Sequence, residues 1–177
     1  MKQAVTTGST RGLGFAMARS FLEAGCSVTI SGRNEANLLK AQAELKHYKQ
    51  VLPVLCDVQD PGQLQKLWQA AQNKWGQVDY WINNAGIAQM HLPLWELEIG
   101  EIEQVININV MGTIYGSRVA MQGMLSQGRG QIFNMEGFGS NNMFRPGMSL
   151  YGTSKRAITY YTRALAEEAA HTGILVG

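Results

Sequence analysis

The feature that most constrains the fold is the alternation of short β-rich runs with helical stretches along the whole chain. The β-rich runs hold branched and apolar residues, whereas the stretches between them repeat apolar residues at helical spacing. This alternation is typical of βαβ units, which build a parallel sheet with helices on both faces. The sequence therefore predicts an α/β protein with a doubly wound parallel β-sheet in a three-layer α/β/α arrangement. The expected strands cover residues 4–6, 28–30, 51–55, 78–82, 131–135 and 174–176.

The expected helices have recognisable start and stop signals. Gly25 follows the helix 15–24 at the position where glycine commonly ends a helix. Asn34 is a candidate N-cap of the next helix, and Asp60 stands before a proline at the first position of a third. Two longer helices are expected at residues 99–125 and 149–171.

Length and composition limit the organisation of the chain. A chain of 177 residues with 45% hydrophobic residues is long enough to bury the core of one domain. We therefore predict a single domain over residues 1–177. Because the last apolar run, 174–176, lies at the end of the chain, we expect the sheet to be truncated within its sixth strand and C-terminally incomplete.

Charge and residue types narrow the choice of partners. The formal charge of +2 comes from 15 basic and 13 acidic residues mixed along the sequence, without the clusters that bind nucleic acid or anionic lipid. Cys26 and Cys56 lie in apolar surroundings and the histidines share no ligand spacing, so we expect free thiols and no metal site. No apolar stretch has the length of a signal peptide or a membrane span. These observations favour a cytoplasmic protein with a small-molecule partner.

A glycine-rich turn connects the first expected strand to the first expected helix. Its glycines allow a sharp bend and a close approach to a pyrophosphate, and the N-terminus of the helix attracts the phosphate charge. The spacing is Gly-x-x-x-Gly-x-Gly, and a turn of this kind can also serve only to pack a helix on a strand. Its position after the first strand favours dinucleotide binding and thus a Rossmann-type sheet. The candidate residues are Gly8, Ser9, Thr10, Arg11, Gly12, Leu13 and Gly14.

The end of the second strand sets the choice between the two nicotinamide dinucleotides. An acidic side chain there accepts hydrogen bonds from a ribose 2′-hydroxyl, whereas a basic side chain forms an ion pair with a 2′-phosphate. This chain has Arg33 and no carboxylate at that point, and Arg11 in the glycine turn adds a second cation. We therefore predict NADP(H). Asp57, after the third strand, is either a cap close to the next helix or a hydrogen-bond partner for the adenine, and the two roles are compatible.

Several motifs together resemble those of the short-chain dehydrogenase/reductase family, over essentially the whole chain. They fall in the order and approximate spacing of that family. Within it, the run Asn-Met-Glu-Gly-Phe-Gly-Ser after the fifth strand looks most like the chlorophyll b reductase branch. The matching motifs are the glycine turn, Asp57-Val58, Asn83-Asn84-Ala85-Gly86, Asn109 in Asn-Val-Met-Gly-Thr, and Tyr151-Gly152-Thr153-Ser154-Lys155.

The resemblance implies roles for individual residues. Tyr151 would be the catalytic acid/base, and Lys155 and Asn109 would support it, the latter by holding a water that links to Lys155. Because Tyr151 and Lys155 are four apart on an expected helix, both side chains rise from one face, and we expect the lysine charge to lower the pKa of the phenol. Lys155 and Tyr151 would also contact the cofactor. The remaining cofactor contacts implied by the motifs are Asp57, Val58, Asn84, Ala85 and Gly86.

One part of the family pattern is altered. The family normally places a serine shortly before the tyrosine, where its hydroxyl bonds the substrate oxygen, at positions that Gly137, Phe138 and Gly139 occupy here. Ser140 is the nearest hydroxyl, and we predict that it replaces that serine, with Ser149 and the Gly137 backbone as weaker alternatives. Glu136 either anchors the loop or faces the substrate, and the sequence leaves both alternatives open.

Two functions from different classes follow from these observations. The first is an NADP(H)-dependent oxidoreductase that transfers hydride between the nicotinamide and a carbonyl or alcohol substrate, with Tyr151 as acid/base. The second is a nucleotide-binding module without turnover, because the segments that cover the substrate in the resembling family are not in this sequence. The helices expected at 99–125 and 149–171 form the pairing surface in that family, so the resemblance implies a homodimer or homotetramer.

Overall fold

A six-stranded parallel sheet forms the centre of the computed structural model, which describes residues 1–177. The strands lie in the order β3-β2-β1-β4-β5-β6, so that β1 and β4 are neighbours at the point where the strand order reverses. This arrangement confirms the predicted doubly wound fold, and ligands of such sheets bind at that point of reversal. The strands are β1 Gln3–Thr6, β2 Ser27–Gly32, β3 Val51–Leu55, β4 Tyr80–Asn83, β5 Gly130–Asn134 and β6 Ile174–Val176.

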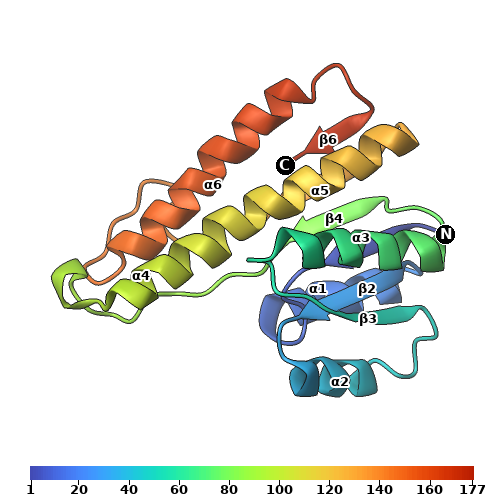
Figure 1. The fold of residues 1–177 in the computed structure, drawn as a ribbon, viewed down its shortest axis with the longest axis horizontal. Coiled ribbons are helices and arrows are strands. Elements are labelled where there is room, and N and C mark those ends of the chain that lie inside the picture. The colour runs from blue at the N-terminus through green and yellow to red at the C-terminus, as the bar shows by residue number, and fades with distance from the viewer.

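Helices cover both faces of the sheet, and α3, α5 and α6 lie side by side on one of them (Figure 1). The helices α1 and α2 pack against β1, β2 and β3 from the other face. As expected, Asn34 Oδ1 accepts a hydrogen bond from the Asn37 N–H at 2.9 Å, and Asp60 Oδ1 accepts one from the Gly62 N–H at 2.8 Å. The helices are α1 Gly12–Glu23, α2 Glu35–Glu44, α3 Pro61–Trp75, α4 Ile99–Ile106, α5 Gly112–Gln127 and α6 Ser149–Glu168, with a 3-10 turn η1 at Leu94–Glu96.

The long helix expected at residues 99–125 is one rod with an irregular middle. A π-helical segment, η2 at Asn107–Met111, joins α4 to α5, and the ribbon continues through it without a break in direction (Figure 1). An insertion of this kind widens the helix by one residue and is frequent at functional sites. Periodicity alone predicted the rod but not the π segment.

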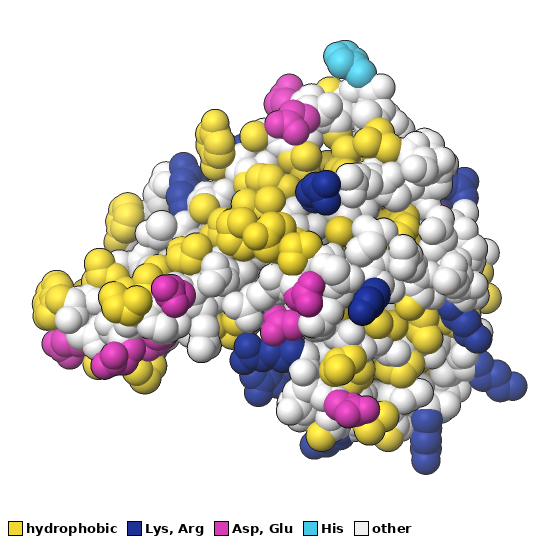
Figure 2. Space-filling view, in the orientation of Figure 1, with side chains coloured by type: hydrophobic (Ala, Val, Ile, Leu, Met, Phe, Trp, Pro, Cys, Tyr) yellow, Lys and Arg dark blue, Asp and Glu magenta, His cyan; other side chains and the backbone are white.

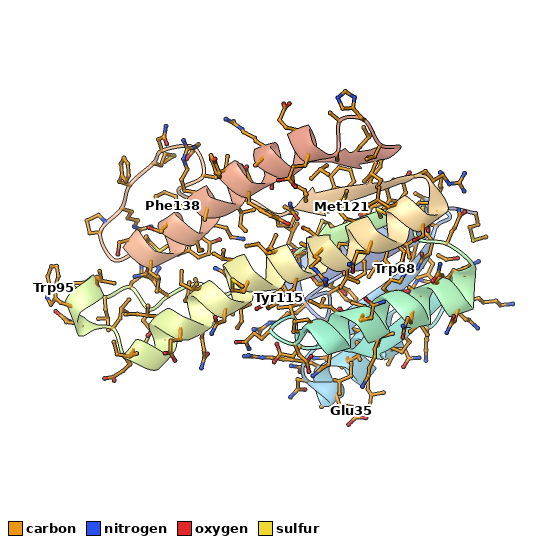
Figure 3. The ribbon with its side chains drawn as sticks, turned by 45° about the horizontal axis from the view of Figure 1, so that its top comes forward. Glu35, Trp68, Trp95, Tyr115, Met121 and Phe138 are labelled. Carbon is orange, nitrogen blue, oxygen red and sulfur yellow. The ribbon has the colours of Figure 1, made fainter.

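Two apolar cores flank the sheet, one on each face. The larger contains Trp68 of α3 and Trp81 of β4, whose ring centroids are 6.0 Å apart. Trp68 lies between α3 and α5 in Figure 3, directly against Gly123, where even a methyl group would collide with the indole ring. Trp68 is therefore a core residue. No helix combines the length and the apolar character needed to cross a bilayer.

A buried polar cluster ties the carboxyl ends of β4 and β5 to the helices above them. Asn83 accepts a hydrogen bond from the Trp81 indole at 2.8 Å and donates to Ser117 at 2.9 Å and to Asn134 at 2.8 Å. Asn134 in turn donates to Thr162 of α6 at 3.0 Å. This cluster fixes α5 and α6 relative to the strand ends from which the candidate site is built.

Candidate active site

The glycine turn is held in place by Ser9. Its buried hydroxyl donates to the Thr6 carbonyl at 2.7 Å and accepts a hydrogen bond from the Ser31 N–H at 2.9 Å, which ties the turn to both β1 and β2. The hydroxyl is therefore used within the protein. Ser9, predicted as a cofactor contact, supports the turn from below, and it does not line the cleft described next.

Asn84, which follows β4, fixes the other side of the turn. Its side-chain amide donates to the carbonyls of Thr7 at 2.9 Å and Gly8 at 3.1 Å. Gly8 approaches Ala85 so closely that a Cβ there would lie 2.8 Å from the Ala85 Cα, and a Cβ on Gly14 would collide with the Asn84 amide. Glycine is needed at both positions because the turn and the start of α1 lie directly against each other and against the segment that follows β4.

A cleft of about 560 Å³ opens above this turn, between the ends of the central strands. Gly12 lines it with φ +57, and no other atom lies within 4 Å of the place where its Cβ would be. A bare glycine backbone at the start of a helix is the cradle that a pyrophosphate requires, so the residues fit a nicotinamide dinucleotide. The cleft is lined by the predicted residues Gly8, Thr10, Arg11, Gly12, Leu13, Gly14, Arg33, Asp57, Val58, Asn84, Ala85 and Gly86, and by Gly32, Asn34, Asn37, Cys56, Ile87 and Ile108, which the sequence did not indicate.

The charged residues of the cleft lie where the sequence analysis expected them. Arg11 and Arg33 are exposed at its mouth, and no carboxylate stands at the end of β2. Asp57 lines the cleft, and its Oδ1 accepts a hydrogen bond from the Gln59 N–H at 3.0 Å in the turn before α3. Asp60 caps α3 itself. Asp57 is thus a turn residue that also faces the cleft.

Tyr151 and Lys155 lie near the Gly86 end of the cleft, on the first turns of α6. The Tyr151 N–H donates to the Gln89 side chain at 2.8 Å, which fixes the start of the helix. Lys155 is buried, and its Nζ donates to the Met135 carbonyl at 2.9 Å and lies 5.8 Å from the centroid of the Tyr151 ring. A Cβ on Gly86 would be only 3.6 Å from that Nζ, so the pair adjoins the cleft although neither residue is among its lining.

Burial is the main influence on the pKa values of Tyr151 and Lys155. It raises the pKa of the Tyr151 phenol above its usual value. Burial also lowers the pKa of Lys155, and the nearby charge of Glu136 opposes that change. The expectation of a lowered pKa for Tyr151 is therefore wrong for this structure, because burial outweighs any effect of the Lys155 ammonium. Tyr151 is protonated at neutral pH here, as a proton donor must be.

Asn109 lies in the π segment η2 and acts as a clamp. Its Oδ1 accepts a hydrogen bond from the Ile87 N–H at 2.8 Å, and its Nδ2 donates to the Ile87 carbonyl at 2.9 Å and to the Ser154 hydroxyl at 3.0 Å. The side chain thus joins the cleft wall to α6 within one turn of Tyr151. Both of its donor hydrogens are used in this way, and the predicted link through water to Lys155 stays a prediction.

The loop between β5 and α6 places Gly137 beside the Tyr151 hydroxyl, and the replacement of the family's serine by Ser140 stays a prediction. The Ser140 hydroxyl donates to the Gly137 carbonyl at 2.7 Å, and this bond uses its only proton. A Cβ on Gly137 would lie 2.6 Å from the Tyr151 Oη. Glu136 is exposed and has no hydrogen-bond or ion-pair partner, so the loop is anchored by the Ser140 bond and not by this carboxylate.

A second, larger groove of about 1120 Å³ lies between the loop 138–148 and α6. It is lined by apolar side chains such as Phe144 and Tyr160, which are 93% and 78% exposed, and by Arg145, Arg156 and Arg163. Phe138, labelled in Figure 3, also comes from this loop. Neither Tyr151 nor Lys155 lines the groove, so its size alone does not make it the reactive site.

The sheet with its glycine turn, the cleft and the adjoining Tyr151 and Lys155 are features of the Rossmann-type fold that binds nicotinamide dinucleotides. A family model described as short chain dehydrogenase matches residues 2–177. The chain therefore belongs to the short-chain dehydrogenase/reductase family.

Among its relatives are plant enzymes of one branch, as the run around Glu136 had indicated. A chlorophyll(ide) b reductase of Arabidopsis thaliana is 37% identical over 166 residues, which are 92% of this chain and 48% of that protein. The chain thus spans between 38% and 49% of the length of the rice and Arabidopsis chlorophyll(ide) b reductases that it matches.

Solved structures of the family share the fold closely. An actinorhodin polyketide ketoreductase with NADPH has a TM-score of 0.92 and 29% identity, over 99% of this chain and 67% of that one. A family member from Burkholderia phymatum in complex with NAD has the same TM-score and 30% identity, over 98% and 63% of the two chains. Both nicotinamide dinucleotides therefore occur among the structural neighbours.

Proposed function

We propose that this protein is an NADP(H)-dependent oxidoreductase that interconverts a carbonyl compound and an alcohol, with Tyr151 as its acid/base. The observation that carries the proposal is the position of the Lys155 Nζ beside Gly86 of the cleft, with the Tyr151 ring centroid 5.8 Å from that Nζ. A proton donor and a buried cation next to a dinucleotide cleft are what carbonyl reduction requires.

The chemistry divides between the cofactor and the chain. A nicotinamide held by the residues of the cleft would supply the hydride, with its two electrons, that the carbonyl carbon accepts. The Tyr151 hydroxyl gives its proton to the carbonyl oxygen as the C=O π bond breaks, so that C–H and O–H bonds form and the phenolate is left. The Lys155 ammonium stabilises this phenolate until a proton from solvent restores it. Asn109 keeps the cleft wall and α6 in register during the step.

The preference for NADP(H) rests on Arg33 and Arg11. Both stand at the mouth of the cleft, and an arginine fork matches a 2′-phosphate in shape and charge. Replacing Arg33 by alanine should weaken NADPH binding by roughly tenfold or more and leave NADH binding within about twofold, since one charge-assisted pair contributes about 1.5–3 kcal/mol. Equal weakening of both cofactors, measured by fluorescence titration, would contradict this assignment.

The substrate and the assembly are inferred from chemistry and from the surface. We propose a small-molecule carbonyl or alcohol substrate, and the plant relatives make chlorophyll(ide) b one member of a test panel. Figure 2 shows hydrophobic side chains gathered over α5 and α6, and pairing of this face would give a homodimer or homotetramer. A cytoplasmic location stays a prediction, since the plant relatives are chloroplastic.

The central experiment compares the parent protein with Tyr151→Phe. NADPH oxidation is followed at 340 nm with a panel of aldehydes and ketones, and NADPH binding is measured by fluorescence. Binding together with tyrosine-dependent oxidation supports the proposal. Binding without tyrosine-dependent oxidation for any substrate would instead favour the nucleotide-binding module without turnover.

A further inference from the structure

Gly137 lies against the hydroxyl group that the proposed reaction uses. It is in the loop after β5, and a Cβ at this position would meet the Tyr151 Oη at 2.6 Å and the Lys155 Cγ and Cε at 3.3 Å each. Real Cβ atoms do not approach a neighbour closer than 3.0 Å, so the first of these contacts cannot form without a shift. The Tyr151 hydroxyl therefore occupies space that a side chain at position 137 would need.

The backbone of Gly137 does not itself require a glycine. Its φ is not among the positive values of the chain, whereas Gly139, two residues later, has φ +97 and lies directly against the Gly152 backbone. Gly139 is thus explained by its own conformation and packing. Gly137 is explained only by the tyrosine and lysine side chains.

The backbone on both sides of this contact is held in place, and so is Lys155. The Gly137 carbonyl accepts hydrogen bonds from the Ser140 N–H at 3.1 Å and the Ser140 hydroxyl at 2.7 Å, which close the loop into a turn. On the other side, the Lys155 Nζ is bound to the Met135 carbonyl. The start of α6 is fixed through the Tyr151 N–H and Gln89. The tyrosine hydroxyl is the part of this contact that would have to turn aside.

We propose that Gly137 is a positioning residue, whose missing side chain lets the Tyr151 hydroxyl lie beside Lys155 at the end of the cofactor cleft. This inference deepens the proposed function and rests on the role of Tyr151 given there. It also explains the altered family pattern at this loop. A side chain at 137 and the observed place of the tyrosine hydroxyl exclude each other, so Ser140 is left to close the turn.

The test is a double-mutant cycle that removes the colliding atom. Gly137→Ala and Tyr151→Phe are made singly and together, and the urea midpoint of unfolding is measured for each. We expect Gly137→Ala to lower the midpoint clearly in the parent and by less than half as much in the Tyr151→Phe background, because phenylalanine lacks the oxygen that the Cβ meets. Gly100→Ala is the matched control, since nothing lies within 4 Å of its Cβ position, and its effect should be equal in the two backgrounds.

Two further readouts separate positioning from a general structural effect. The ionisation of Tyr151 is obtained from the ultraviolet titration of each protein minus that of its Tyr151→Phe counterpart. In Gly137→Ala the titration should shift toward the value of a free tyrosine, as the hydroxyl turns to solvent, while the Kd for NADPH stays within twofold. Turnover of an accepted carbonyl should fall about 10- to 100-fold, as expected for a displaced catalytic group.

Each outcome decides the inference. An equal loss of midpoint in both backgrounds, or failure of both to fold, would overturn it, because the glycine would then be needed by the backbone. A Gly137→Ala protein that folds only together with Tyr151→Phe would support it. If Tyr151 titrates in Gly137→Ala as it does in the parent, the inference is overturned. Faster turnover in Gly137→Ser than in the parent would overturn it as well. The stability cycle needs no activity, so it stands apart from a failure of the proposed function.

Discussion

Replacing Asn109 by alanine should both destabilise the fold and loosen the cofactor cleft. The side chain is 1% exposed and makes three hydrogen bonds, two with the Ile87 backbone and one with Ser154. Each such bond contributes about 0.5–1.5 kcal/mol net, and a partner left unpaired away from water adds to the loss. We expect the free energy of unfolding to fall by about 2–4 kcal/mol. The Gly86–Ile87 segment lines the cleft, so the affinity for NADPH should fall as well.

The assay is urea unfolding followed by the fluorescence of the tryptophans, combined with NADPH titration of the folded protein. Asn73→Ala is the control, because Asn73 is exposed on α3 and makes no hydrogen bond through its side chain. It should change the unfolding free energy by no more than about 0.5 kcal/mol. If Asn109→Ala loses no more unfolding free energy than the control, or if its NADPH affinity is unchanged, the role of Asn109 as a clamp is refuted.

Three other predictions concern the glycine turn, an acidic residue and a buried thiol. Gly14→Ala should abolish NADPH binding and destabilise the protein by about 1–3 kcal/mol, since its Cβ collides with Asn84, whereas Gly12→Ala should be milder because its Cβ position is open. Burial alone would raise the pKa of Asp79, but the hydrogen bonds that its carboxylate accepts from Lys2, the Gln3 N–H and Gln77 outweigh this and lower the pKa. The stability that Asp79 contributes is therefore complete above its usual pKa of 3.8 and is lost as the pH falls further. The unfolding free energy of Asp79→Asn should differ most from that of the parent at neutral pH, and a constant difference down to pH 2 in urea unfolding would contradict this. Burial, and then the charges of two aspartates, raise the pKa of Cys56 to about 12, so iodoacetamide at pH 8 should modify it only in the unfolded protein, as mass spectrometry would show.

Much of the fold could be predicted because local signals and tertiary packing agree. The alternation of strands and helices gave the sheet, and Asn34 and Asp60 are caps in the structure as expected. The ends of elements were less certain, since α1 begins at Gly12 and α6 ends at Glu168. The π segment could not be predicted from helical periodicity, and neither could the bonds from its Asn109 to Ile87, which lies on a distant part of the chain.

Most residues of the candidate site could be predicted from the sequence, but some of their contacts could not. Twelve of the fifteen expected cofactor residues line one cleft, because their motifs all follow strands of a parallel sheet, whose carboxyl ends share one edge. Spacing could not tell that Ser9 turns away from the cleft, or that burial outweighs Lys155 in setting the pKa of Tyr151. The contact of Gly137 with the Tyr151 hydroxyl could not be predicted either, because a single sequence does not show which glycines are required by a neighbouring side chain.

The two bonds of the Ser9 hydroxyl have a consequence for the energetics of recognition. Since the bend between β1 and α1 is already immobilised by its own side chain, a diphosphate meets amides that are preorganised and need no ordering on arrival. The entropic penalty of shaping the loop has been met during folding instead. Ser9→Ala should accordingly weaken the nucleotide through a lower association rate and a larger unfavourable entropy, without the loss of a single direct contact.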